Sequence, residues 1–329
     1  MIRILKLTRW PNLLIIILTM YLIRYCIIGL FAHSANLSFS LSERHFFMLV
    51  CSVVLITAAG YAINDYFDTA TDAINKPEKM VLGISMTPRK GMLLHFIFSI
   101  TGISIGWFVS KQSGVTNLVF IHIISVGLLW FYSSEFKRMF LIGNLVVAIL
   151  TAVVPLLPVM YEMPGLINQF KVQIAENQEL FLSYPDIPKA ITHNLHMMWY
   201  WAAAYSGFAF FLTMAREIVK DTEDLMGDIS IGSKTIPIQM GINFARTLSG
   251  FFVCLVCLPL FFLQYKMIGS KDYFSIGYIT LALQMPAAWF LYRLAFANSS
   301  SDYHSLSRII KLIMLSGLLF LLVYWLREK

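Results

Sequence analysis

Residues 46–72 read FFMLVCSVVLITAAGYAINDYFDTATD and combine the two features that decide the fold. Residues 46–63 carry no charged side chain, whereas the residues that follow directly include Asp65, Asp68 and Asp72. A helix of about 20 apolar residues spans the hydrocarbon core of a bilayer. The stretch therefore predicts a transmembrane helix that leads into an acidic site at one membrane surface.

The composition of the whole chain is suited to lipid. Of its 329 residues 58% are hydrophobic and only 13% are charged, against about 25% charged in soluble domains. We expect an all-α integral membrane protein that forms one transmembrane domain over residues 1–329. Its nine predicted transmembrane helices lie at 13–31, 46–63, 92–109, 117–132, 143–160, 197–214, 247–263, 273–294 and 309–326.

The distribution of basic residues predicts the topology. With nine crossings, the N-terminus and the loops after the second, fourth, sixth and eighth helices hold sixteen of the 25 Lys and Arg residues. Because cytoplasmic loops are enriched in Lys and Arg, these segments are predicted to face the cytoplasm from the cell (inner) membrane. The net charge of +7 is then explained by topology and by attraction to anionic lipid, so we expect no nucleic-acid partner.

A second acidic segment repeats the spacing of the first. Residues 221–228 read DTEDLMGD, so that Asp221, Asp224 and Asp228 are spaced three and then four, as Asp65, Asp68 and Asp72 are. An even number of predicted helices separates the segments, which places both at the same membrane face. Residues 64–77 and 216–228 therefore predict a duplicated helical unit with a site between its halves.

The spacing of these side chains favours a divalent metal. If each helix continues past the membrane surface, the oxygen ligands of each motif share one helix face and repel one another. Magnesium (Mg2+) is a hard cation that binds one or two carboxylates and takes its other ligands from water and phosphate oxygens. The predicted metal ligands are Asn64, Asp68, Asp72, Asp224 and Asp228.

The alternative is a solvated acidic surface without a ligand. We disfavour it because eight of the chain's 18 acidic residues fall in these two short segments. Neighbouring lysines, including Lys76, Lys79 and Lys220, have the charge to grip phosphate oxygens. For any single lysine, the topology signal explains its presence equally well.

The two motifs resemble those of the UbiA superfamily of intramembrane prenyltransferases. The first family motif is matched by Asn64, Asp65, Asp68, Asp72, Asn75, Lys76 and Pro77. The second is matched by Lys220, Asp221, Asp224, Gly227 and Asp228. Weaker matches are Arg9 with Asn12, and Tyr132-Ser133 followed by Lys137-Arg138 and Gly143-Asn144. The chain departs from the family at Lys79-Met80, where Arg-Pro is common, which puts bidentate phosphate binding there in doubt.

The resemblance implies a bundle of nine helices around a central cavity that opens to lipid. It also implies transfer of a prenyl group from a prenyl diphosphate, held through Mg2+, to a hydrophobic or amphiphilic acceptor, with no obligate protein partner. Aromatic faces, among which Tyr61, Tyr66 and Tyr132 stand out, would stabilise the carbocation-like transition state. The implied catalytic residues are Asp68, Asp72, Asp224, Asp228 and Lys220, and the implied substrate-binding residues are Asn64, Asp65, Lys76, Lys79, Asp221, Lys137, Tyr132 and Asn12.

The identity of the acceptor stays open at this point. Residues 216–221 and 132–144 look most like the branch that alkylates geranylgeranylglyceryl phosphate in ether-lipid synthesis. Aromatic acceptors of quinone synthesis, such as 4-hydroxybenzoate or dihydroxynaphthoate, are the main alternative. A secondary transporter is disfavoured, because its acidic residues should lie near mid-membrane rather than at one face. The polar segment 161–196 is predicted to be an irregular or partly helical excursion on the opposite face, most simply a surface loop.

Overall fold

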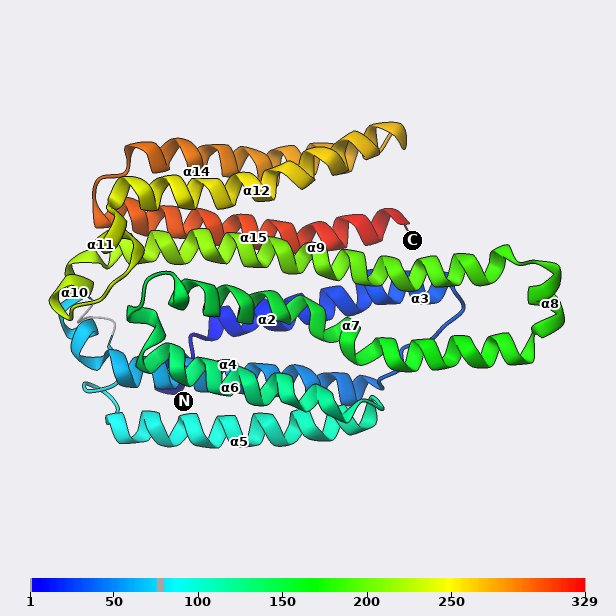
Figure 1. Cartoon of the computed structure of the whole chain (residues 1–329), viewed down its shortest axis with the longest axis horizontal. Helices are drawn as coiled ribbons and strands as arrows, with labels where there is room; N and C mark the ends of the chain where they lie inside the picture. Colours follow the sequence, from blue (N-terminus) through cyan, green and yellow to red (C-terminus); the bar gives the residue numbers. More distant parts are fainter. Residues whose placement is uncertain (1, 76–79, 329) are drawn as a thin grey trace.

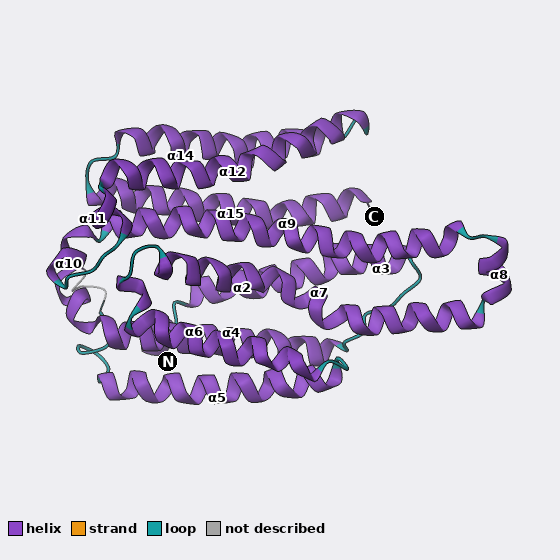
Figure 2. Cartoon of the chain, viewed as in Figure 1, coloured by secondary structure: helices purple, strands orange, loops and turns teal. Residues whose placement is uncertain are grey.

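The computed structural model describes residues 2–75 and 80–328, with side chains described over 3–69 and 80–327. Long helices run roughly alongside one another and are joined by short loops (Figures 1 and 2). The first part of the chain contains α1 (Ile2–Leu7), α2 (Trp10–Leu22), the π-helix η1 (Ile23–Ile28), α3 (Gly29–Ser34), α4 (Glu43–Asn75), α5 (Pro88–Gln112), the 3₁₀ turn η3 (Thr116–Leu118) and α6 (Val119–Ser134).

The second part begins with the 3₁₀ turn η4 (Phe136–Arg138). The second acidic segment of the chain lies beside this turn. It continues with α7 (Ile142–Glu176), α8 (Gln178–Ser183), α9 (Asp186–Glu223), α10 (Leu225–Ser230), α11 (Ile236–Met240), α12 (Ile242–Gly269), α13 (Tyr273–Tyr278), the π-helix η5 (Ile279–Gln284), α14 (Met285–Phe296) and α15 (Ser300–Glu328). The all-helical membrane fold predicted from the sequence is confirmed.

Eight helical stretches of the described chain are long and apolar enough to cross a membrane, so the protein is a multi-pass integral membrane protein. Each of the nine predicted spans lies within one helix or one continuous run of helices. The predicted span that is not among the eight apolar stretches is 197–214, in α9, which has a lower mean hydropathy. This helix packs against α7, α12 and α15, and a helix covered by protein has less need of apolar side chains than one that faces lipid.

Glycine permits close packing of α4, α5 and α6. A Cβ atom on Gly102 of α5 would lie 2.8 Å from the Ile56 side chain of α4, and one on Gly106 would lie 2.8 Å from the His122 ring of α6. Real Cβ atoms avoid such distances, so these helices approach only because glycine is present. Small residues serve the same purpose at many transmembrane helix contacts.

The segment 161–196 is helical over most of its length, so the partly helical alternative holds and the simpler expectation of a surface loop was wrong. Helix α7 continues to Glu176 and α9 begins at Asp186, so that with α8 they form a helical hairpin that projects past the other helices (Figure 1). Leu166, Ile191 and Leu195 are buried in one core cluster with residues of η1 and α3. These apolar residues are interspersed among polar ones, and their burial explains why this polar stretch is helical.

A buried ion pair holds the bundle near the base of this hairpin. The Arg24 Nε atom of η1 lies 3.2 Å from Glu162 Oε1 of α7. The other Glu162 oxygen accepts hydrogen bonds from the backbone N–H groups of Ser40 (2.6 Å) and Leu41 (3.0 Å), and Arg24 donates to the Leu41 carbonyl at 2.5 Å. We call Arg24 and Glu162 the outer clasp, because they fix the α3–α4 loop against α7.

Candidate functional site

The first acidic motif lies on the last turns of α4. This helix continues without a break from its apolar part to Asn75, as the sequence predicted. The Asn64 side-chain amide donates a 2.7 Å hydrogen bond to Asp68 Oδ2, which is the contact expected of residues four apart on one helix face. The amide oxygen of Asn64 and one oxygen of Asp68 therefore point to the same side of α4.

The second motif is not one continuous helix, which corrects the sequence prediction. Helix α9 ends at Glu223, and Asp224 (φ −94°, ψ 12°) separates it from α10. The Asp228 N–H still donates to the Asp224 carbonyl at 3.1 Å. Asp224 and Asp228 therefore remain one turn apart, although α10 leaves the direction of α9.

The two motifs face each other at one end of the bundle. Helix α10 packs against α4, and both lie at the end opposite α8 (Figure 1). Burial, followed by the neighbouring carboxylates of Asp224 and Asp68, raises the pKa of Asp228 to about 6. The site therefore concentrates acidic groups from segments about 160 positions apart in the chain.

Lys137 joins the first motif to the turn after α6. Its ammonium group pairs with Asp68 Oδ1. A Cβ atom on Gly143, at the start of α7, would lie 2.7 Å from Lys137 Cα, so glycine is needed for this turn to pack under α7. The Lys234 N–H donates to the Arg138 carbonyl at 2.7 Å, which ties the loop after α10 to the same turn.

Arg9 and Asn12 bring the start of the chain to the site. The Arg9 guanidinium pairs with Asp65 Oδ1 at 3.0 Å and lies over the Tyr61 ring, 4.8 Å from its centroid. The Asn12 amide donates to the Tyr61 hydroxyl at 2.9 Å. The Tyr61 ring is therefore already in contact with a cation in this structure.

The last turns of α9 add further charged groups. Asn144 of α7 donates to Asp221 Oδ2 at 2.7 Å. Burial raises the pKa of Asp221 well above its usual range, while the Asn144 hydrogen bond opposes the rise. The Oε1 atom of Glu217 pairs with Arg216, and its Oε2 atom lies 3.5 Å from Lys220 Nζ. Lys220 is thus held at the polar end of the site by a neighbouring carboxylate.

The ligands present suit a hard divalent cation. The predicted donors with described side chains, Asn64, Asp68, Asp224 and Asp228, all offer oxygen, and burial followed by the neighbouring Asp224 and Asp68 carboxylates raises the pKa of Asp228. Among the described residues, no three His, Cys, Asp or Glu side chains form a metal site of their own. Mg2+ needs only one or two carboxylates, with water and phosphate completing its shell, so these residues fit it.

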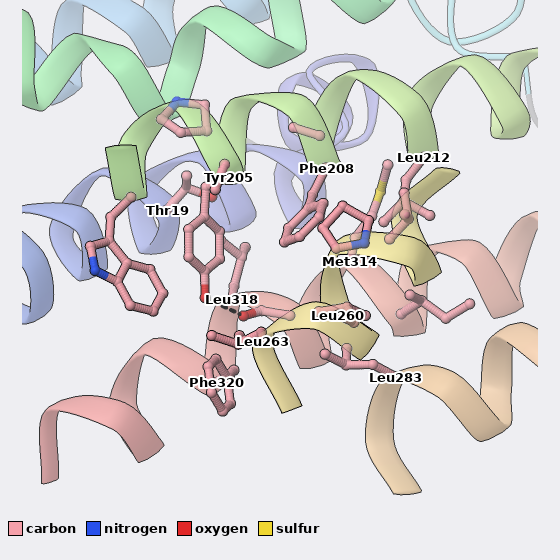
Figure 3. Close-up of a pocket in the computed structure, with 18 of the residues that line it drawn as sticks. Thr19, Tyr205, Phe208, Leu212, Leu260, Leu263, Leu283, Met314, Leu318 and Phe320 are labelled. Atoms are coloured by element: carbon pink, nitrogen blue, oxygen red, sulfur yellow. Dashed lines mark hydrogen bonds between the residues drawn. The ribbon is translucent and has the colours of Figure 1, made fainter. Parts of the chain in front are cut away.

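A cavity of about 470 Å³ lies in the apolar part of the bundle. Its wall is formed mainly by α2, α7, α9, α12 and α15. It reaches Ile15, three residues after Asn12, and Ile313 of α15, and it extends along α9 from Leu212 past Tyr205 (Figure 3). The apolar cavity therefore begins within about a turn of the polar end.

Residues 22–312 match the protein-family model described as the UbiA prenyltransferase family. The chain belongs to this family. It is therefore an intramembrane prenyltransferase, as the two Asp-rich motifs predicted.

Similar proteins include curated members of one branch of the UbiA family. The chain is 27% identical over 264 residues to the digeranylgeranylglyceryl phosphate synthase of Methanosphaera stadtmanae, covering 80% of this chain and 81% of that protein. It is 28% identical over 235 residues to the synthase of the same name from Thermococcus kodakarensis, covering 71% and 69%. A solved structure described as digeranylgeranylglyceryl phosphate synthase in membranes shares the fold, with a TM-score of 0.56, 21% identity and coverage of 99% and 98%.

Most of the predicted site residues of this UbiA protein lie at the end of the bundle just described. The structure brings to one end Asn12, Asn64, Asp65, Asp68, Tyr132, Lys137, Lys220, Asp221, Asp224 and Asp228. The side chain of Asp72 and residues Lys76 and Lys79 lie outside the described part of the site, so their roles stay predictions.

Sequence reasoning assigned no role to Asn144 and Arg216, which contact Asp221 and Glu217. For Asn144 a signal was present, because it belongs to the weak Gly143-Asn144 match. For Arg216 the signal was its place in the segment 216–221, which looks like the geranylgeranylglyceryl-phosphate branch, although topology alone also explains a basic residue at this face.

Proposed function

We propose that this UbiA prenyltransferase transfers a prenyl group, in a reaction that depends on Mg2+, from a prenyl diphosphate to geranylgeranylglyceryl phosphate. The observation that carries the acceptor is the similarity along 80% of the chain to a protein named digeranylgeranylglyceryl phosphate synthase. The polar end and the apolar cavity support the proposal because they match the two parts of an amphiphilic substrate.

The diphosphate would bind between the two Asp-rich motifs. Asn64, Asp68, Asp224 and Asp228 would hold Mg2+, as would Asp72, and Lys220 would contact phosphate oxygens as a point charge. When bound, the metal neutralises the charge that develops on the departing diphosphate. The residues of this chain orient the diphosphate so that its ester oxygen leaves toward the motifs while the first carbon of the chain faces the cavity.

The prenyl chain would lie in the apolar cavity, with its reactive end near the aromatic residues of the polar end. The carbon–oxygen bond of the diphosphate breaks, and the allylic carbon gains positive charge. The Tyr61 ring, which already lies beneath the Arg9 guanidinium, has the electron-rich face that stabilises such charge. A hydroxyl of the acceptor then forms the new carbon–oxygen bond, and its proton passes to an oxygen of the departing diphosphate.

A second group of cations suits a phosphorylated acceptor. Lys311 of α15 lies close enough to Arg216, Lys220 and Arg9 for their charges to act on its ammonium group, with Glu217 as a neighbouring carboxylate. Glu217 pairs with Arg216 and Lys220 and offsets part of this positive charge, and a bound anion would offset the rest. Geranylgeranylglyceryl phosphate carries its negative charge on a compact head group with an apolar tail, which suits the junction between these residues and the cavity.

The site is proposed to face the cytoplasm from the cell membrane. The N-terminus lies nearer to the motif end than to the hairpin of α8 (Figure 1), and the segments predicted at this face hold sixteen of the 25 Lys and Arg residues. A cysteine introduced at Ser230 should be labelled by an impermeant thiol reagent only after the cells are opened. A cysteine introduced at Leu182 should already be labelled in intact cells. The reverse pattern would place the site outside.

The acceptor is tested with purified protein, Mg2+ and labelled geranylgeranyl diphosphate. Geranylgeranylglyceryl phosphate, 4-hydroxybenzoate and dihydroxynaphthoate are supplied separately. We expect label in a lipid product only with the glyceryl phosphate. Product only with an aromatic compound would replace the acceptor but keep the prenyl transfer, whereas no product with any acceptor would contradict the proposed function.

A further inference from the structure

We propose that Tyr205 of α9 sets the longest prenyl chain that this enzyme accepts, by crossing the cavity and narrowing it at a fixed distance from the diphosphate site. The proposal rests on the proposed function and adds to it a residue that determines substrate length. It is carried by the position of one rigidly held ring in the cavity and by the distance of that ring from the motif end.

Tyr205 crosses the cavity from one wall to another. Its hydroxyl donates a 3.0 Å hydrogen bond to the Gly317 carbonyl of α15, and the ring extends between α9 and α15 in Figure 3. Only 7% of the residue is exposed. Since both its backbone and its hydroxyl are anchored, the ring cannot swing aside without losing a hydrogen bond in an apolar environment, which is costly.

Other aromatic side chains support the ring on its far side from the motifs. Trp201, one turn earlier on α9, stacks on Tyr205 with ring centroids 6.5 Å apart, and it also packs on Tyr324 of α15 at 4.8 Å. Both Trp201 and Tyr205 line the cavity. Beyond them lies Tyr200, which is 65% exposed, so that the far end of the cavity approaches the lipid-facing surface.

The position of the ring matches a chain of four isoprene units. Tyr205 precedes Lys220 by 15 positions on one helix, which corresponds to about 22 Å along its axis at about 1.5 Å per residue. An extended isoprene unit has four carbon–carbon bonds in the repeat and spans about 5 Å. Starting at the level of Lys220, four units reach the ring, three stop short of it and five must pass it.

The cavity lining nearer the motifs includes Phe208, whose ring packs edge-on against Tyr205 with centroids 6.3 Å apart. Phe208 and Leu212 lie on the cavity wall between Tyr205 and the polar end. Neither of these apolar side chains is fixed to another helix by a hydrogen bond, as Tyr205 is. The described side chains thus place the first anchored obstruction at Tyr205. A longer chain would have to displace both Tyr205 and the stacked Trp201.

The test compares wild type with Tyr205→Ala and Tyr205→Phe, using prenyl diphosphates of three, four, five and six isoprene units. We measure kcat/KM for each with the same acceptor. In Tyr205→Ala the ratio of the six-unit to the four-unit substrate should rise about tenfold or more, as expected for space opened in an apolar pocket. Tyr205→Phe keeps the ring and should keep the wild-type length profile.

Tyr278 supplies a matched control for loss of a cross-helix hydrogen bond. Its hydroxyl donates to the Ser316 carbonyl of α15 at 2.9 Å, next to the acceptor of Tyr205, but it is not among the residues that line the cavity. Tyr278→Ala should lower thermal stability in detergent about as much as Tyr205→Ala does, with no change in the length profile.

Three results would overturn the proposal. They are an unchanged profile in Tyr205→Ala, an equal shift in Tyr278→Ala, and a shift in Tyr205→Phe as large as in Tyr205→Ala. Each requires that wild type transfers a prenyl group. Failure of wild type with every diphosphate would instead contradict the proposed function, so the two failures are distinguishable.

Discussion

The two ends of the bundle each bring together charged side chains from distant helices, but they neutralise charge differently. In the outer clasp, Arg24 and Glu162 are both 0% exposed, and backbone N–H groups satisfy the second oxygen of Glu162. At the motif end, Lys137 and Asp68 are 13% and 18% exposed. Here burial, followed by the neighbouring carboxylates of Asp224 and Asp68, raises the pKa of Asp228.

The difference separates a structural ion pair from a binding site. A sealed pair offers a ligand no space, and its worth lies in holding the loop before α4 against α7. A cluster of carboxylates beside an apolar cavity is stabilised when a cation binds among them. The contrast leads us to expect that changes at the motif end affect turnover, whereas changes at the clasp affect stability.

The largest expected effect is loss of turnover without metal or without a motif carboxylate. Excess chelator, Asp68→Ala or Asp224→Ala should each lower prenyl transfer by about a thousandfold or more, because charge on the departing diphosphate would be left unneutralised. Added Mg2+ should restore the chelated wild type. Glu179→Ala, at the exposed tip of the hairpin, is the control and should act like wild type. Full activity in excess chelator would contradict the prediction.

A double-variant cycle tests whether the two motifs act as one unit. Asp68→Asn and Asp228→Asn should each reduce kcat by several powers of ten, and the double variant should be scarcely worse than the poorer single one, since groups that act together are not additive. Measurements of kcat at saturating substrate decide the question. Losses that multiply would indicate independent roles, with one motif positioning the substrate.

The outer clasp should respond in stability rather than in catalysis. Glu162→Gln leaves the buried Arg24 charge without its main partner and should lower the free energy of unfolding by about 3 kcal/mol. Turnover per folded molecule should stay within about twofold of wild type. Glu43→Gln is the control, because Glu43 also lies near Arg24, at 3.4 Å, but is 61% exposed and should cost less than about 1 kcal/mol.

The smallest effect is expected for Lys137, whose ammonium pairs with Asp68. Lys137→Gln should strengthen apparent Mg2+ affinity about threefold, because a cation no longer competes for this carboxylate. It should also lower kcat, since the diphosphate loses a positive neighbour. Mg2+ titrations of activity measure both, with Lys90→Gln as a control at an exposed lysine of α5. Unchanged Mg2+ affinity would show that Lys137 does not compete with metal.

Local sequence predicted the elements of the motif end well, but not their relative placement. The contact of Asn64 with Asp68 follows from helical periodicity alone. The break of α9 at Asp224 was missed. Glycine and proline commonly end a helix, but the first such residue between 216 and 228 is Gly227, which comes after the break. The hairpin of α7, α8 and α9 was missed for the opposite reason, since its polar residues concealed the buried side chains of Ile191 and Leu195.

By itself the sequence determined that the chain is a helical membrane protein, which end of its helices carries the acidic motifs, and to which family it belongs. Long apolar runs admit only helices in lipid, because every backbone polar group must be satisfied within the segment, and the motif spacing fixes a helix face. The tertiary structure alone decided which charges meet, such as Arg24 with Glu162 and Lys137 with Asp68, and where Tyr205 crosses the cavity. Such contacts join residues more than 60 positions apart and depend on how helices pack, which no local pattern encodes.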